Sequence, residues 1–194
     1  MKMMETNRLR LRNFYVTDAQ SFLEYAANPR VNCFLSDKVS TLEEAALKLQ
    51  NRSCEDSYIA VSLKESNALI GELFYLQEEP DTFNIGWNFN ARYEGMGYAH
   101  ESVEAFFKYL FTQKEARRLY AYVEDDNLRS QKLCEKLGMR KEGCFIEFVS
   151  FTEYEDGTPK YENTFQYALL KREWLGNFSN SNLIKLDSKL NDLE

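Results

Sequence analysis

The stretch "RYEGMGYAHESVEAFFKYLF", residues 92–111, places two glycines immediately before a helical pattern with a broad apolar face. Glycine tolerates a positive φ and lacks a Cβ atom, so it suits a tight turn or the close approach of a ligand to the backbone. The N–H groups at the start of a helix are unpaired and attract anions. Gly95 and Gly97 therefore have two interpretations, a plain turn or a phosphate-binding loop, and this stretch alone does not choose between them.

Strand and helix patterns alternate along the chain on both sides of this turn. Residues 8–14 alternate Leu with Arg, which indicates a strand with one buried face. Runs rich in β-branched and aromatic residues predict further strands at 57–63, 68–76, 82–90, 117–124, 143–157 and 161–174. Apolar residues at helical spacing predict helices at 16–29, 42–52, 98–113 and 127–138. This order indicates an α/β chain built around one mixed sheet.

Capping residues sharpen three of the helix starts. Thr17 and Ser40 are the expected N-caps of the first two helices, with Gln20 and Glu43 completing capping boxes. Asn127 is the expected N-cap of the last helix, and Gly138 is its expected terminating residue.

Composition limits the class of protein. A chain of 194 residues suggests one domain, and its net charge of −7 argues against nucleic acid as a partner. No apolar run approaches the ~20 residues that span a bilayer, and the first residues lack a secretory signal, so we expect a cytoplasmic protein without a membrane partner. The four cysteines are scattered without metal-ligand spacing, so no metal site is expected.

Two blocks of sequence carry a resemblance to a known family. Arg92, Gly95 and Gly97 form "R-x-x-G-x-G" followed by "YA", and "N-x-x-S-x-x-x-x-E-K-L-G-M" runs from Asn127 to Met139. Together they resemble the acetyl-CoA-dependent N-acetyltransferase superfamily (GNAT). "TNRLRLRNF" and "YENTFQYALLKREW" resemble the branch that acetylates ribosomal-protein N-termini and related small amines. The resemblance covers residues 5–175, and residues 176–194 form a polar C-terminal tail.

The resemblance implies a fold and a co-substrate. The expected fold is a single α/β domain with a mixed, mostly antiparallel seven-stranded sheet, two splayed central parallel strands and about four helices. Acetyl-CoA is the implied co-substrate. Its pantetheine arm carries amides, which can bind like a short strand along unpaired backbone at Phe89 and Asn90. The implied pyrophosphate cradle consists of Arg92 and the backbone amides of Gly95, Met96, Gly97, Tyr98 and Ala99.

The implied activity is transfer of an acetyl group from acetyl-CoA to a primary amine, either a protein N-terminus or a small amine, by direct attack in a ternary complex. The alternative is a CoA-binding module for sensing or assembly with little catalysis. A homodimer is one expected form of assembly. Asn127 and Ser130 are implied to lie at the cofactor arm and the thioester, although helix capping alone also explains both residue types.

The general base is the weakest part of the resemblance. Many relatives carry Glu at the position of Asn84 and Asp at the position of Asn163, and neither Asn accepts a proton at neutral pH. Glu72 or a water wire is the expected substitute. Ser130 is the first candidate acid, with Tyr161 and Tyr167 as rivals.

Other reactive residues have plainer explanations. His100, the one histidine, is expected to lie at the surface or to pack at a core edge rather than to act in catalysis, and Cys134 is expected to be a small core residue. Glu124, Asp125 and Asp126 are expected to form a solvated turn, with attraction of a cationic acceptor as the alternative.

Overall fold

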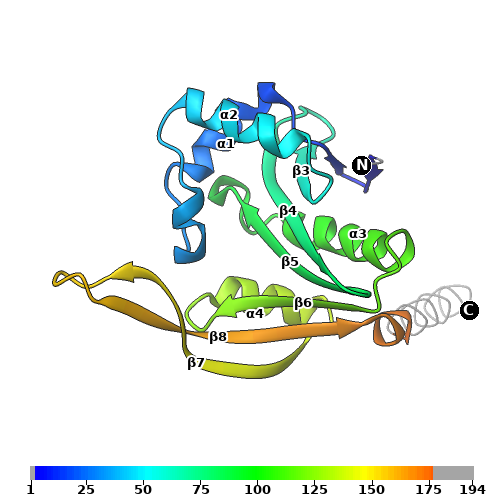
Figure 1. Ribbon diagram of the computed structural model, residues 1–194. Coiled ribbons are helices and arrows are strands. Elements are labelled where there is room, and N and C mark those ends of the chain that lie inside the picture. The colour runs from blue at the N-terminus through cyan, green and yellow to red at the C-terminus, as the bar shows by residue number, and fades with distance from the viewer. Residues whose placement is uncertain (1–2, 177–194) are drawn as a thin grey trace, which may run out of the picture.

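Eight strands form one sheet in the order β1-β2-β3-β4-β5-β6-β8-β7 (Figure 1). The computed structural model of the protein describes residues 3–176. The strands are β1 (Met4–Glu5), β2 (Leu9–Arg12), β3 (Tyr58–Leu63), β4 (Leu69–Glu78), β5 (Thr82–Phe89), β6 (Arg118–Glu124), β7 (Arg140–Glu153) and β8 (Pro159–Leu170). All neighbours are antiparallel except β5 and β6, which are parallel.

Two pairs of α-helices cover opposite faces of the sheet. They are α1 (Ala19–Ala26), α2 (Leu42–Ser53), α3 (Tyr98–Thr112) and α4 (Leu128–Lys136), with short 3-10 helices η1 (Val16–Asp18), η2 (Asn32–Asp37) and η3 (Ala91–Tyr93). The apolar sides of α1 and α2 pack over Ala60 and Leu69 in a smaller core. In the larger core, α3 places Phe106 against Tyr75, on the other face. The expected α/β fold is confirmed.

Local details differ from the sequence predictions. The sheet has eight strands rather than seven, because Met4 and Glu5 pair with β2, and a two-residue strand leaves no recognisable pattern. The N-cap of α1 is Asp18 rather than Thr17, and the capping box of α2 is formed by Thr41 and Glu44, one residue later than expected. Asn127 does cap α4, by accepting a hydrogen bond from the backbone N–H of Ser130.

The two parallel strands separate soon after they meet. Pairing between β5 and β6 is limited to Thr82–Asn84 with Arg118–Tyr120, although both strands continue further. Beyond these residues the sheet is open, as the resemblance implied. The edge of β5 that faces β6 therefore keeps backbone hydrogen-bonding groups that have no strand partner there.

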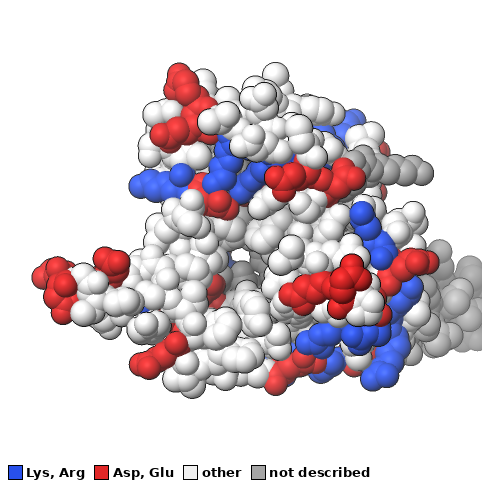
Figure 2. All heavy atoms as spheres, viewed as in Figure 1, with Lys and Arg blue, Asp and Glu red and all other residues white. Residues whose placement is uncertain are grey.

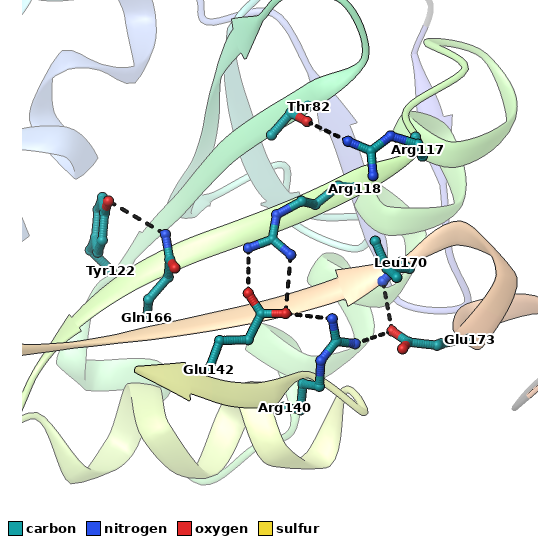
Figure 3. Close-up of polar contacts among 9 residues, drawn as sticks. All are labelled: Thr82, Arg117, Arg118, Tyr122, Arg140, Glu142, Gln166, Leu170 and Glu173. Carbon is teal, nitrogen blue, oxygen red and sulfur yellow. Dashed lines mark hydrogen bonds and ion pairs between the residues drawn. The ribbon is translucent and has the colours of Figure 1, made fainter. Parts of the chain in front are cut away.

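The C-terminal strands form a long hairpin. It extends beyond the body of the molecule at the end that carries Asp156 and Gly157 (Figure 1). At the opposite end, a charged network links β6, β7 and the helical residues that follow β8 (Figure 3); its members are Arg118, Arg140, Glu142 and Glu173. Within residues 3–176, no helix combines the length and apolar character needed to cross a membrane. Residues 177–194 of the predicted tail lie outside the described part of the chain.

Candidate active site

Two cavities meet at the opening between β5 and β6. The larger, of about 430 Å³, lies beside α3 and α4, and the smaller, of about 260 Å³, lies beneath η2 on the other face of the sheet. Figure 2 shows the molecule hollowed between the half that carries α1 and α2 and the half formed by β6, β7 and β8. Both cavities are lined by Phe34, Trp87, Asn127 and Ser130. A ligand in one cavity can therefore reach a ligand in the other through the sheet.

The glycine turn opens directly into the larger cavity. Gly95 and Gly97 both have φ of +77°, and Gly97 is the N-cap of α3. A Cβ atom built at Gly95 would have no neighbour within 4 Å, and one at Gly97 would meet only Arg8, at 3.5 Å. Arg8 also donates a hydrogen bond to the carbonyl of Met96 (3.0 Å), which fixes the turn from outside. The turn therefore leaves open space in front of the first amides of a 15-residue helix, which is a setting that favours an anion.

The opened edge of β5 supplies the second part of this cavity. The N–H of Asn90 donates to the carbonyl of Ile70 on β4 (2.9 Å). Successive residues of a strand direct their backbone groups to opposite edges, so Phe89 directs its groups toward the opening. The Asn90 side chain is also engaged: it accepts from Arg92 N–H and donates to Glu24. Of the two predicted pantetheine contacts, Phe89 directs its backbone groups to the unpaired edge of β5. Asn90 instead uses its backbone and side chain in bonds within the protein.

Basic residues surround the cavity, but Arg92 is not among those that line it. Its side chain is exposed on η3. Arg30, Arg129, Lys132 and Lys136 line the cavity instead. The sequence prediction missed these four residues. Arg129, Lys132 and Lys136 are spaced so that they share one side of α4, and this spacing could have predicted a basic surface there. Arg30 lies in a connecting segment, where no sequence pattern indicates its position.

Glu94 lies between two of these cations. Arg30 donates to one of its carboxylate oxygens (2.7 Å) and Arg129 to the other (2.5 Å). These hydrogen bonds lower the pKa of Glu94. The bridge joins the segment after α1 to the first turn of α4 at the rim of the cavity.

Ser130 occupies the junction of the two cavities. The indole N–H of Trp87 donates to its hydroxyl oxygen (3.2 Å), and its backbone N–H donates to Asn127 Oδ1 (3.2 Å). Because Trp87 can only donate, the Ser130 hydroxyl keeps its own proton available for another acceptor. Asn127 therefore caps α4, and Ser130 in the same helical turn lies where the two cavities meet.

Glu72 lies away from both cavities. It is 2% exposed, and its carboxylate is hydrogen-bonded to Arg52, which also pairs with Asp37 (3.0 Å). Burial raises the pKa of Glu72, and Arg52 opposes that shift. A carboxylate held in this pair is poorly placed to remove a proton from a bound amine, so the geometry disfavours Glu72 as the base.

The predicted tyrosine acids are not at the junction either. Tyr161 is 56% exposed on the hairpin, and Tyr167 is buried on the core side of β8. Neither lines the two cavities. Among the predicted catalytic residues, Ser130 is the one that the structure brings to the opening.

Asn84 and Asn163, the two neutral residues at the positions expected for a base, lie in different surroundings. Asn84 lines the smaller cavity, on the face that it shares with Gly86. Asn163 instead accepts a hydrogen bond from Glu147 N–H and donates one to Asp125, so its amide is engaged by β7 and by the turn after β6. An acid at 84 would reach the cavity, whereas Asn163 serves the β7–β8 connection.

Cys134 and His100 lie in different surroundings. Cys134 is buried in the larger core, where burial raises the pKa of its thiol to about 12, which confirms the packing prediction. His100 lies in the first turn of α3 and lines the larger cavity. Among residues 3–176, no cluster of three or more His, Cys, Asp or Glu side chains is arranged to hold a metal ion.

The expected solvated turn holds for two of its three acids. Asp125 and Asp126 are exposed, but Glu124 is 6% exposed and lines the smaller cavity. The solvated-turn prediction is therefore wrong for Glu124. The reason is that β6 continues to this residue beneath η2, a tertiary contact without a local signal.

Fold and site together define an α/β protein in which two parallel strands separate and the N-terminus of a helix can bind an anion. Residues 8–140 match the family model described as an acetyltransferase (GNAT) domain. The chain belongs to this family and is an N-acetyltransferase.

Individual relatives agree with this assignment. The chain is 32% identical over 174 residues to an uncharacterized N-acetyltransferase, YnaD, of Bacillus subtilis (strain 168), covering 87% of this chain and 97% of that one. A crystal structure of a GNAT-family acetyltransferase from Bacillus anthracis superposes with a TM-score of 0.79 at 27% identity, covering 88% and 99%. The ribosomal L7/L12 alpha-N-protein acetyltransferase RimL in complex with coenzyme A shares the fold, with a TM-score of 0.71 at 19% identity and coverage of 87% and 98%.

Proposed function

We propose that the protein transfers an acetyl group from acetyl-CoA to a primary amine. The observation that carries the proposal is the pair of cavities that meet at Ser130, one beside the glycine turn and one on the far face of the sheet. Two substrates can approach the same point from opposite sides, which suits direct transfer in a ternary complex. The net charge of −7 also supports a cationic acceptor, and cytoplasmic location and homodimerisation remain part of the proposal.

The larger cavity fits coenzyme A in chemical character. The amides at the start of α3 and the open space at Gly95 and Gly97 suit a pyrophosphate. The free edge at Phe89 suits the amides of pantetheine, and Lys132 and Lys136 add positive charge at the rim. When bound, acetyl-CoA supplies an activated acetyl group as a thioester.

The protein contributes orientation and proton handling. Backbone N–H groups on the free edge of β5 can donate to a carbonyl oxygen that gains negative charge. The Ser130 hydroxyl, held by Trp87, can donate its proton to a departing thiolate. The amine has to reach the junction in its neutral form, although a Lys-type amine has a pKa of about 10.4 and an α-amine of about 8.

The test combines CoA binding with turnover. Calorimetric titration with CoA and a free-thiol assay with acetyl-CoA against a panel of primary amines should show binding and amine-dependent thiol release. Binding without thiol release for any amine would favour a CoA-binding module. No binding of CoA would overturn the proposal.

A further inference from the structure

Glu124 is a buried carboxylate that the assignments above leave without a role. It is the last residue of β6, it is 6% exposed, and it lines the smaller cavity together with Ser130. It also lines a neighbouring hollow of about 380 Å³ beside the start of α4. Because β6 alternates, Glu124 shares the α1–α2 face of the sheet with Tyr122.

Within residues 3–176, this carboxylate forms no salt bridge with a Lys or Arg side chain. Arg30 and Arg129 line the neighbouring hollow, but both bind Glu94. The Cys33 thiol of η2 lies beside Glu124, and burial together with this carboxylate raises the pKa of that thiol. From β8, Glu162 adds a further negative charge near Cys33 and accepts a hydrogen bond from Asn32 (2.6 Å).

A buried carboxylate without an ion-pair partner costs free energy, because the single thiol of Cys33 replaces only part of the hydration that it loses. A bound ammonium group would restore that balance. The position thus selects for a cationic ligand that enters from the smaller cavity.

The rest of the cavity wall selects for an apolar body. The aromatic side chains that line it are Phe34, Phe74, Trp87, Tyr122 and Phe151. Phe34 packs edge-on against Phe74, with 6.1 Å between ring centroids. Aromatic faces attract ammonium groups and pack against rings, so this wall suits a phenyl-sized substituent better than a polyhydroxylated one.

We propose that Glu124 binds the ammonium group of the acceptor, and that the acceptor is a primary amine carried on an apolar, phenyl-sized body. This proposal rests on the proposed acetyl transfer and names the acceptor class for the same site. Asn84 leaves the opposite wall of the cavity uncharged, so Glu124 is the acidic side chain that lines it.

The proton balance follows from this placement. The ammonium nitrogen loses one proton to the Glu124 carboxylate, which later releases it to solvent. The freed electron pair forms the new C–N bond to the acetyl carbon, and the C–S bond breaks with its electron pair leaving on sulfur. The second proton lost from nitrogen ends on that sulfur. In a buried, weakly polar cavity, transfer of the first proton removes two opposite charges at once, which favours the neutral amine that attacks.

The test compares Glu124→Gln with Glu104→Gln, which makes the same change at an exposed residue of α3 outside the cavities. The first readout is calorimetric binding of 2-phenylethylamine, both to the ligand-free protein and in the presence of CoA. The second is kcat/KM for 2-phenylethylamine and for benzhydrazide, whose nucleophilic nitrogen is neutral at pH 7.5. Melting temperature and CoA affinity are measured for every form.

Glu124→Gln should weaken 2-phenylethylamine binding and lower its kcat/KM by roughly thirty-fold or more, as expected when one member of a buried charge pair is removed. Benzhydrazide turnover and CoA affinity should change less than about three-fold, because neither depends on ammonium binding. Glu104→Gln should behave like the wild type.

Equal losses for both acceptors, no loss for either, or no binding of 2-phenylethylamine to the wild type would overturn the proposal. Failure of the proposed function is seen separately, as absence of CoA binding or thiol release in the wild type. Amine binding to the ligand-free protein still decides the role of Glu124 in that case.

Discussion

The indole N–H of Trp87 donates a hydrogen bond to the hydroxyl oxygen of Ser130, and 3.2 Å separates the two atoms. The bond connects β5 to α4 across the opened end of the sheet, where the two cavities meet. It fixes the Ser130 side chain in one orientation and leaves its proton free to be donated. A hydroxyl in the first turn of α4 is thereby held as a donor at the junction.

Ser130→Ala should lower kcat on the order of 10²-fold, because one positioned donor at developing charge is lost. Affinity for CoA, measured by calorimetry, should change little. The capping bond should survive, since it uses the backbone N–H of residue 130. A variant with wild-type kcat would limit Ser130 to its role in α4.

Gly97→Val should remove CoA binding while the fold survives. Valine would strain a backbone at φ +77° and place carbon atoms in the open space before α3. Gly157→Val is the matched control, because Gly157 has φ +82° and a Cβ atom there would have no neighbour within 4 Å in the distant hairpin turn. Both variants should lose melting temperature, and the control should keep its CoA affinity. Equal CoA affinity in the two variants would contradict the phosphate-loop assignment.

Glu72→Gln should reduce the free energy of unfolding by roughly 3 kcal/mol, because it removes one charge of the buried pair with Arg52. Turnover per folded molecule should stay within about three-fold of the wild type, since Glu72 lies outside the cavities. Chemical denaturation and kcat measure the two effects. Glu104→Gln, at an exposed position of α3, is the control and should change neither. A large loss of kcat with unchanged stability would restore Glu72 as the base.

The local parts of this molecule could be predicted from sequence, and the contacts between distant segments could not. Asn127 and Gly138 flank one helix and Ser130 lies in its first turn, so their spacing alone predicted α4 and its cap. Gly95 and Gly97 likewise belong to one short turn. Arg52 and Glu72 meet only when α2 packs on β4, and no periodicity in the sequence predicts that pairing. The same limit hid the burial of Glu124, which depends on η2 crossing the end of β6 and on the separation of β5 from β6.

Stability should fall as the pH drops below the ordinary carboxyl range. Hydrogen bonds from Arg118 lower the pKa of Glu142 below its ordinary value of 4.5, so the folded protein holds this group ionised after the unfolded chain has bound a proton (Figure 3). Its stabilising contribution is present above pH 4.5 and is lost as the pH falls through the folded pKa. Melting temperatures measured from pH 6 to pH 3.5 should therefore decline, and Glu142→Gln should start lower and decline less steeply. Parallel curves for the two forms would count against the network.

The last prediction concerns Asn84, which lines the smaller cavity on the same face of the sheet as Glu124. If Glu124 accepts the amine proton, kcat/KM of Glu124→Gln should rise with pH only as the amine loses its own proton. A second carboxylate on this face can take over, so adding Asn84→Glu to that variant should move the rise back to lower pH.

Gln77→Glu, which makes the same amide-to-carboxylate change at an exposed residue of β4, should not restore activity. The measurement is kcat/KM for 2-phenylethylamine against pH in the wild type, Glu124→Gln and the two double variants. Restoration by Glu at 84 but not at 77 would show that the cavity needs a carboxylate on this face rather than a particular residue. Superimposable profiles for Glu124→Gln with and without Asn84→Glu would mean that the proton leaves by a route that does not pass residue 84.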